Sequence, residues 1–332
     1  MHKLVICRSL HPDGLALLGA RKDAKTTLLS LDIDGPSIQQ QLTEHIRDAF
    51  GVLIGGRVRI PEELVATAPA LRVISRFGVG YDKVDLPACT KHGVLLSVAN
   101  GANDLAVAEH AMMLMLAVAR RTVEYDASVR AGTWMIQSGR RMHELAGRKV
   151  LVIGYGRIGT RVARLCKAFG MTTMVSDPAF PTPRIAADGH IPVTKDVWAA
   201  IPEADVVTLH CPLDEVTRGM VNEAFLKRMK PTAWLINSAR GPIVNEAALV
   251  AALPDGTIEA AGLDVLAHEP APAGNPLFAL PNVVLSPHNA AQPLECLARV
   301  SRRAVLNLLD FIDGTIDPGY TVNPEVLGRN AT

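Results

Sequence analysis

The stretch Lys149-Val150-Leu151-Val152-Ile153-Gly154-Tyr155-Gly156-Arg157-Ile158-Gly159 decides how this chain folds. Five residues of an apolar strand lead into three glycines and the start of a helix. In such a loop the first glycine makes the tight turn, the second lets the backbone approach a pyrophosphate, and the third lets the helix pack on the strand. The unpaired N–H groups of the helix start attract phosphates. The stretch predicts a dinucleotide site with Gly154, Gly156, Arg157, Ile158 and Gly159 at the cofactor.

The sequence that follows the loop supports this interpretation. Apolar residues with helical spacing come first, and a second apolar run over residues 171–176 ends at Asp177. An acidic side chain at that strand end accepts hydrogen bonds from the adenine ribose and repels a 2′-phosphate, which predicts NAD rather than NADP. A glycine turn in an ordinary strand–helix unit remains the alternative, since the bare glycine pattern is weak evidence.

Composition narrows the class of protein. The chain has 332 residues, enough for two domains, and 34 basic residues against 33 acidic ones give a formal charge of +1. This balance favours a small-molecule partner and argues against binding to nucleic acid or an anionic membrane surface. The longest apolar segment, residues 105–119, is broken by Glu109 and His110 and is shorter than the ~20 residues of a membrane span.

The cysteines indicate the compartment. Five cysteines are scattered without CxxC spacing, which favours a reducing compartment, and we expect a cytoplasmic protein. The apolar run at the N-terminus is too short for a signal peptide. No HExxH motif or Cys/His cluster occurs, so we expect no metal site.

Two series of alternating strands and helices predict an α/β protein with two doubly wound parallel sheets. The first series has no glycine loop, and its expected strands are residues 4–7, 26–31, 52–54 and 72–75. The second series has six expected strands, at residues 149–153, 171–176, 206–209, 234–236, 260–263 and 283–285. After Pro293 one long helix, residues 295–311, is expected to return to the first domain.

Three chemically suited residues lie in the segments that follow strands of the second series. Arg240, Glu269 and His288 come after the expected strands at 234–236, 260–263 and 283–285. Ligands of open α/β sheets bind outside the carboxyl ends of the strands, so we expect these side chains to converge beside the nucleotide.

Hydride transfer at a carbon that bears oxygen needs such a set. His288 can pass a proton to or from the oxygen, and a carboxylate such as Glu269 fixes the tautomer of its imidazole. Arg240 can hold a substrate carboxylate with two parallel hydrogen bonds. His268 is interpreted as a rim residue and His110 as a buried, hydrogen-bonded side chain.

The chain resembles the D-isomer-specific 2-hydroxyacid dehydrogenases over nearly all of its length. The resemblance rests on ordered motifs: Phe77-Gly78-Val79-Gly80-Tyr81-Asp82-Lys83-Val84-Asp85, Val107-Ala108-Glu109-His110, the glycine loop with Asp177, Leu209-His210-Cys211-Pro212-Leu213 with Thr217, Asn237-Ser238-Ala239-Arg240-Gly241, Asp264-Val265 with Glu269-Pro270, and Pro287-His288.

The resemblance implies roles for individual residues. Arg240, Glu269 and His288 are then the catalytic triad, and Asp264 holds the nicotinamide carboxamide. The backbone N–H groups of Val79 and Gly80 are implied to bind the substrate carboxylate. Further residues are implied at the substrate (Val79, Gly80, Asn103) and at the cofactor (Val107, His210, Cys211, Pro212, Thr217, Ser238, Ala239).

The resemblance also implies the domain organisation. A flavodoxin-like substrate domain, residues 1–100 and 292–332, is interrupted by a Rossmann NAD-binding domain, residues 101–291. An arm over about residues 120–147 is implied to help form a homodimer.

Some residues depart from the family pattern. Asn289-Ala290-Ala291 follows His288 where the family has two glycines, which narrows the backbone room at the nicotinamide. Phosphoglycerate enzymes carry extra arginines for the phosphate; Arg76 matches one of them, but Gly55 and Ile136 stand where two others would be. Glyoxylate or hydroxypyruvate is therefore a better candidate substrate than phosphoglycerate.

Two other functions stay open at this point. The first is formate dehydrogenase, although Glu269 argues against it because that subfamily pairs its histidine with glutamine. The second is an NAD-sensing binding protein of the kind that shares this fold.

Overall fold

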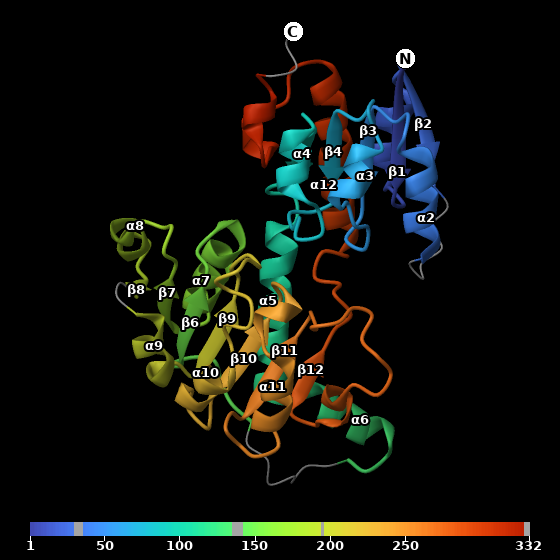
Figure 1. Ribbon diagram of the computed structural model, residues 1–332. Coiled ribbons are helices and arrows are strands. Elements are labelled where there is room, and N and C mark those ends of the chain that lie inside the picture. The colour runs from blue at the N-terminus through green and yellow to red at the C-terminus, as the bar shows by residue number, and fades with distance from the viewer. Residues whose placement is uncertain (30–35, 135–141, 194–195, 329–332) are drawn as a thin grey trace. The chain divides into compact units, whose positions relative to one another are not determined.

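The chain divides into two compact units in the computed structural model (Figure 1). The structure describes residues 1–29, 36–134, 142–193 and 196–328, so part of the expected arm, including Ile136, lies outside the described residues. The first unit comprises Met1–Asn103 and Gln292–Thr332, and the second comprises Asp104–Ala291.

The first unit is built on a five-stranded parallel sheet with the strand order β2-β1-β3-β4-β5. This is the order of flavodoxin-like folds, which confirms the predicted fold class. The strands are β1 (His2–Cys7), β2 (Ala24–Leu28), β3 (Gly51–Ile54), β4 (Val73–Arg76) and β5 (Leu95–Val98). The prediction of four strands was incomplete, because it missed β5, which is as short and as fully buried as the predicted strands β3 and β4.

Helices cover both faces of this sheet. One face holds the side chains of Leu4, Ile6 and Leu53 against the long C-terminal helix α12 (Leu294–Ile312), which is near the red end of the colour bar in Figure 1. The other face packs against Leu42 and Leu64. The remaining helices are α1 (Pro12–Gly19), α2 (Pro36–His45), α3 (Glu62–Ala66) and α4 (Leu86–Lys91).

The second unit is built on a seven-stranded parallel sheet with the order β12-β11-β10-β9-β6-β7-β8. Its strands are β6 (Lys149–Ile153), β7 (Thr172–Ser176), β8 (Ile191–Pro192), β9 (Val206–Leu209), β10 (Trp234–Asn237), β11 (Ala260–Leu263) and β12 (Val283–Leu285). Six of them were predicted; β8 was not, because its two residues are too few to show a pattern and one is proline. The order reverses between β6 and β9, and this switch point is where open α/β sheets bind nucleotides.

Alternate residues of the β6 strand enter two separate cores, which is why the strand reads as continuously apolar. Val150 and Val152 pack under α5 (Asp104–Arg120) and α7 (Arg157–Ala168). Leu151 and Ile153 enter the opposite core, which α10 (Glu223–Arg228) and α11 (Glu246–Ala252) close. The other helices are α6 (Thr122–Arg130), α8 (Thr182–Ala187) and α9 (Val197–Ala200).

Among the described residues, no helix combines the length and the apolar character that a membrane span requires.

Candidate active site

The glycine loop after β6 has the geometry that its sequence predicts. Gly154 has a φ of +96°, and a Cβ atom there would lie 2.6 Å from the backbone nitrogen of Cys211. A Cβ atom at Gly159 would lie 1.9 Å from the carbonyl oxygen of Gly154, so the close packing of α7 on β6 requires glycine. At Gly156 a Cβ atom would meet nothing within 4 Å. The helix start is therefore open on the side where a pyrophosphate would approach the backbone.

Asp177 lies at the carboxyl end of β7 and contacts this loop. Its Oδ2 accepts a hydrogen bond from the backbone N–H of Tyr155 at 2.7 Å, and its Oδ1 accepts one from that of Ala179 at 2.8 Å. Each carboxylate oxygen has a second lone pair, so the side chain can still accept hydrogen bonds from ribose hydroxyls. Its position fits an adenine ribose at the end of β7.

The side chain of Tyr155 fixes the loop from inside the second unit, which sequence reasoning did not anticipate. The ring is fully buried, its hydroxyl donates to Asp188 Oδ2 at 2.8 Å, and it meets Phe180 and His190 edge-on. Burial raises the pKa of Tyr155, so the phenol stays protonated and keeps donating.

The segment after β9 lies against the glycine loop, as the contact between Gly154 and Cys211 requires. The Nε2 atom of His210 is 2.8 Å from Thr208 Oγ1, and burial lowers the pKa of His210 to about 3, so the ring is neutral. Burial likewise raises the pKa of Cys211 to about 11. The hydroxyl of Thr217 donates to the carbonyl of Pro212 at 2.7 Å and closes the turn.

Two buried polar atoms at the same edge of the sheet are available to a ligand. Ser238 Oγ, after β10, and Asn289 Oδ1, after β12, have no hydrogen-bond partner in the part of the chain that the structure describes. Buried polar atoms of this kind usually find partners, so these two fit a polar ligand such as a nucleotide.

His288 and Glu269 form a hydrogen-bonded pair. The distance between His288 Nδ1 and Glu269 Oε2 is 2.6 Å, and the side chains are 47% and 33% exposed. Glu269 Oε1 also accepts from the backbone N–H of Leu266 at 3.1 Å. A carboxylate can only accept, so the pair assigns a proton to Nδ1 and leaves Nε2 to face a substrate.

Arg240 lies at the same edge, because β10, β11 and β12 are neighbouring parallel strands. Its Nη1 donates to the carbonyl of Ala239 at 2.7 Å. A Cβ atom at Gly241 would lie 1.9 Å from the carbonyl oxygen of Leu266, so the backbone after Arg240 packs against the loop that carries Glu269. The structure thus joins Glu269 and His288 by a hydrogen bond and packs the backbone next to Arg240 against the loop that carries Glu269; a contact of the Arg240 side chain with this pair stays a prediction.

The carboxylate of Asp264, which is expected to hold the nicotinamide carboxamide, already makes several hydrogen bonds within the protein. The carboxylate is 1% exposed, and Oδ1 accepts from Ser286 Oγ at 2.6 Å and from the N–H of Asn289 at 2.9 Å. Oδ2 accepts from the N–H of Ala290 at 3.1 Å, and His110 Nε2 lies 3.2 Å from Oδ1. The direct contact of Asp264 with the cofactor stays a prediction.

The expected substrate residues Val79, Gly80 and Asn103 belong to the first unit. Val79 and Gly80 follow Gly78, whose φ is +120°, in the loop after β4. Asn103 is buried, and its Oδ1 has no hydrogen-bond partner among the described residues. The roles of these residues stay predictions, as does that of Val107 on α5 of the second unit.

Arginines at the carboxyl edge of the first sheet were not singled out as a group by sequence reasoning. The guanidinium of Arg8 lies 4.5 Å from the ring centre of Phe77, and its Cδ is 3.2 Å from where a Cβ atom at Gly55 would be. Burial and the neighbouring charge of Arg57 lower the pKa of Arg8. Arg76 Nη2 lies 3.6 Å from a Cβ atom built at Gly56. This concentration of positive charge suits an anionic ligand.

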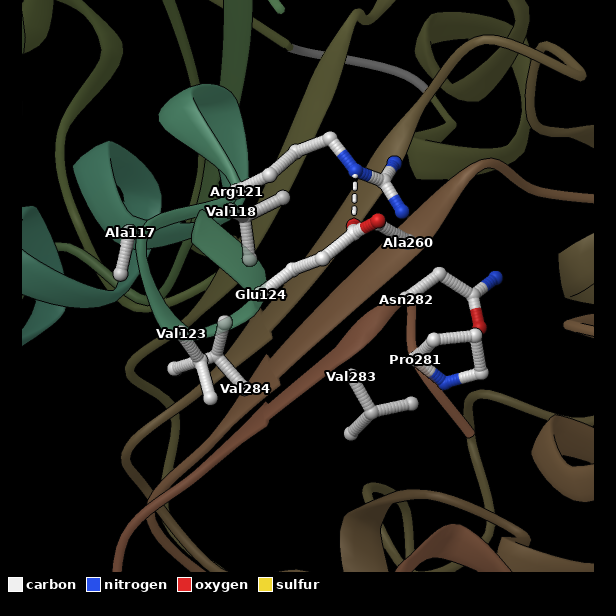
Figure 2. Close-up of a pocket in the computed structure, with 10 residues that line it drawn as sticks. All are labelled: Ala117, Val118, Arg121, Val123, Glu124, Ala260, Pro281, Asn282, Val283 and Val284. Carbon is white, nitrogen blue, oxygen red and sulfur yellow. Dashed lines mark hydrogen bonds and ion pairs between the residues drawn. The ribbon is translucent and has the colours of Figure 1, made fainter. Parts of the chain in front are cut away.

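The pocket in Figure 2 lies at the other edge of the second sheet. It is lined by Ala260 and Val283, the first residues of β11 and β12, and by Arg121, which donates to Glu124 Oε2 at 2.7 Å. Its volume of about 20 Å³ has room for one water molecule. It is therefore separate from the nucleotide site.

Taken together, the fold and the site define an NAD-binding oxidoreductase with a histidine–carboxylate pair. The model of the NAD-binding domain of the D-isomer specific 2-hydroxyacid dehydrogenases matches residues 112–290. A glyoxylate reductase of Thermofilum pendens is 35% identical over 98% of this chain and 95% of its own length. A D-3-phosphoglycerate dehydrogenase of Methanocaldococcus jannaschii is 35% identical over 89% of this chain but only 54% of its own length. The chain belongs to the D-isomer specific 2-hydroxyacid dehydrogenase family.

Solved structures agree with this assignment. The crystal structure of D-lactate dehydrogenase from Aquifex aeolicus with NAD and lactic acid has a TM-score of 0.84 at 26% identity, over 97% of this chain and 99% of that one. An NAD-dependent formate dehydrogenase from Staphylococcus aureus, in complex with NAD, also has a TM-score of 0.84 at 26% identity, over 97% and 98% of the two chains.

The predicted family, the fold class and the cofactor NAD are confirmed. The protein is an NAD-dependent oxidoreductase of 2-hydroxy and 2-keto acids. The formate dehydrogenase and NAD-sensor alternatives are not favoured.

Proposed function

We propose that this enzyme reduces a small unphosphorylated 2-keto acid, glyoxylate or hydroxypyruvate, to the hydroxy acid, with His288 as the acid and base. The observation that carries the proposal is the 2.6 Å hydrogen bond between His288 and Glu269 at the carboxyl edge of the NAD-binding sheet. Bound NADH supplies the hydride for C2, and the residues below supply binding and the proton.

Each residue has a distinct part in the proposed reaction. Arg240 binds the substrate carboxylate and orients the keto group. His288 gives the proton on Nε2 to the oxygen that becomes the hydroxyl, and takes it back in the reverse direction. Glu269 accepts from Nδ1, which fixes the imidazole and stabilises its charged form before the proton leaves.

The cofactor contacts that we propose are those of the open glycine loop. Gly154, Gly156, Arg157, Ile158 and Gly159 would hold the pyrophosphate. Asp177 would hold the adenine ribose, and the segment that includes His210, Cys211, Pro212 and Thr217 would line the adenosine half. Ser238, Ala239, Asp264 and Val107 would lie toward the nicotinamide.

The choice of a small keto acid has two supports. Relatives named glyoxylate reductase match this chain over almost their full length, in Thermofilum pendens and also in Aeropyrum pernix at 34% identity. Gly55, which lies next to Arg8, has no side chain, so this position lacks the arginine that phosphoglycerate enzymes use to bind the phosphate. We propose the first unit as the substrate domain, with Val79, Gly80 and Asn103 at the substrate, and the second unit as the NAD-binding domain.

We further propose a cytoplasmic homodimer. All five cysteines are free thiols, and four are buried, which suits a reducing compartment. Exposed apolar side chains of Met113, Leu116 and Phe169 line a hollow of about 420 Å³ on α5 and after α7, and they support a contact between two copies. Met113→Asp should then yield monomers in sedimentation velocity; an unchanged particle mass would reject this face.

The test of the proposed reaction is a substrate panel. Purified protein is mixed with NADH and with glyoxylate, hydroxypyruvate, pyruvate or 3-phosphohydroxypyruvate, and the absorbance of reduced nicotinamide is followed. We expect the highest kcat/KM for glyoxylate or hydroxypyruvate, and weaker activity when NADPH replaces NADH. A preference for the phosphorylated acid would overturn the substrate assignment. If NADH binds but no keto acid of the panel causes its oxidation, the proposed reaction is wrong.

A further inference from the structure

His110 is a partly buried histidine of α5 that the proposed reaction does not use. Its side chain is 14% exposed, and its Nε2 lies 2.8 Å from Ser286 Oγ and 3.2 Å from Asp264 Oδ1. These two partners come from segments that follow or end strands β12 and β11, far along the chain from the helix. The contact therefore connects α5 with the segment that carries His288.

The hydrogen bonds determine which atom of His110 carries a proton. Ser286 has a single hydroxyl proton, and that proton is donated to Asp264 Oδ1 at 2.6 Å. The hydroxyl oxygen can then only accept from His110. His110 must carry a proton on Nε2, and it acts as a fixed donor into the Ser286–Asp264 pair.

Asp264 passes this constraint to the backbone around His288. Its carboxylate accepts from the N–H groups of Asn289 and Ala290, and its carbonyl accepts from the N–H of His288 at 2.7 Å. His288 has a φ of +53°, a left-handed conformation that costs free energy for any residue with a Cβ atom. Such a conformation persists only where the surroundings hold it, and three hydrogen bonds to Asp264 do so here.

We propose that His110 is a positioning residue: through Ser286 and Asp264 it holds the backbone of residues 288–290 and so aims the His288 imidazole. This inference rests on the proposed role of His288 as acid and base. It explains why a polar residue that can donate occupies an otherwise apolar helix face packed on β11 and β12.

The pKa of Asp264 provides a measurement that can distinguish a positioning role of His110 from a general loss of protein stability, which would not change this pKa. Burial raises this pKa, but the hydrogen bonds from His110, Ser286 and Asn289 outweigh burial and keep it below its ordinary value. Loss of the His110 donor should raise it. Asp264 would then be protonated, and lose acceptor strength, at a higher pH than in the native protein.

Other titratable and charged groups at this edge must stay constant in the comparison. They are His288, Glu269 and Arg240, in the loops after β12, β11 and β10. None of them is altered in the variants below, so a change in the pH profile can be assigned to the His110–Asp264 contact.

The test compares two substitutions at position 110. His110→Phe keeps a ring but removes the donor, whereas His110→Gln keeps an N–H group that can reach Ser286. Amide hydrogen exchange at Asn289 and Ala290, measured without cofactor, should be roughly 10-fold faster in H110F and close to native in H110Q. Turnover of the best keto acid by H110F should fall roughly 10- to 100-fold. The acid limb of its pH profile should move up by about one pH unit, with H110Q partly restored.

His143 provides a matched control. Its side chain is 18% exposed and its Nε2 lies 3.1 Å from Glu259 Oε1, so the two form a similar histidine–carboxylate pair. Glu259 directly precedes β11, so this pair lies at the opposite edge of the sheet from His288. H143F should lower the melting temperature without changing exchange at residues 289–290 or the pH profile.

Two outcomes separate the inference from the proposed function. The positioning role is wrong if H110F, like H143F, only lowers the melting temperature. In that case the amide exchange rates at residues 289–290 and the acid limb of the pH profile would match those of the native protein. If the native protein reduces no keto acid, the proposed function is wrong, and the exchange rates still decide whether His110 holds the segment.

Discussion

Substitution of single glycines in the nucleotide loop should separate cofactor binding from folding. Gly156 and Gly159 are three residues apart, yet a methyl group would meet different surroundings at each. At Gly156 it would meet nothing within 4 Å, and the residue has φ −68° and ψ −163°, which alanine adopts readily. At Gly159 it would lie 1.9 Å from the carbonyl oxygen of Gly154.

The magnitudes follow from this geometry. Gly156→Ala should change the stability of the cofactor-free protein by less than about 1 kcal/mol, because the smaller conformational freedom of alanine in the unfolded chain is offset by its poorer fit than glycine at the N-cap of α7. The melting temperature should therefore shift by no more than about 4 °C. Its methyl group would stand between the helix start and the pyrophosphate and lengthen charge-assisted hydrogen bonds. We expect the Kd for NADH to rise roughly 100-fold.

Gly159→Ala should instead destabilise the fold. Ordinary contact of a Cβ atom begins near 3.4 Å, so a distance of 1.9 Å forces α7 away from β6. The cost of such overpacking is about 3 kcal/mol, which lowers the melting temperature by about 6–12 °C. NADH binding falls as well, because the helix start moves.

Two measurements check this pair of predictions. Differential scanning calorimetry without cofactor gives the stabilities, and quenching of protein fluorescence by NADH gives the affinities. Native NADH affinity in G156A would refute the placement of the pyrophosphate over this residue. Native stability in G159A would refute the argument that helix and strand need glycine at their contact.

Three further substitutions test the chemistry and the cofactor preference. His288→Asn should lower turnover by roughly 10²- to 10⁴-fold and leave NADH binding unchanged. His268 is an exposed histidine beside Glu269, and His268→Asn should change neither turnover nor NADH binding. Equal losses of turnover in the two variants would reject His288 as the acid. Arg240→Lys keeps the charge but loses the two-pronged geometry, so kcat/KM should fall roughly 10- to 100-fold, and an unchanged value would remove Arg240 from the reaction. Asp177→Ala should weaken NADH binding roughly 10-fold and relax the rejection of NADPH, and a native protein that already prefers NADPH would contradict the assignment.

Much of the fold was predictable because its signals are local. The strand, the glycines and the helix start of residues 149–159 adjoin in the sequence, and Asp177 follows at the end of the next strand. The placement of Arg240, Glu269 and His288 in the segments after three neighbouring strands needed only the rule that parallel strands end together, and the structure joins two of them, Glu269 and His288, by a hydrogen bond. Two strands were missed: β8 has only two residues, one of them proline, whereas β5 has the same length and burial as the predicted strands β3 and β4.

The inner contacts of the site could not be predicted, because they join distant segments through side-chain geometry. The Tyr155 hydroxyl reaches Asp188, and His110 reaches Ser286 across 176 positions of sequence. A tyrosine or a histidine in the sequence does not indicate which distant residue its side chain will contact. The motif that contains His110 was visible in the sequence, but whether its imidazole meets solvent, apolar side chains or a carboxylate depends on the packing of α5 against β11 and β12.

The interruption of the first unit by the second has a consequence for synthesis on the ribosome. Residues 104–291 form one continuous stretch, so they can acquire their tertiary structure as soon as they emerge. The first unit cannot, because Leu4, Ile6 and Leu53 complete their core only with Ala304 and Leu308 of α12. Residues 1–103 therefore cannot complete their core until α12 has been translated. A chain that stops before α12 would carry a folded second unit attached to an incompletely packed, aggregation-prone first unit.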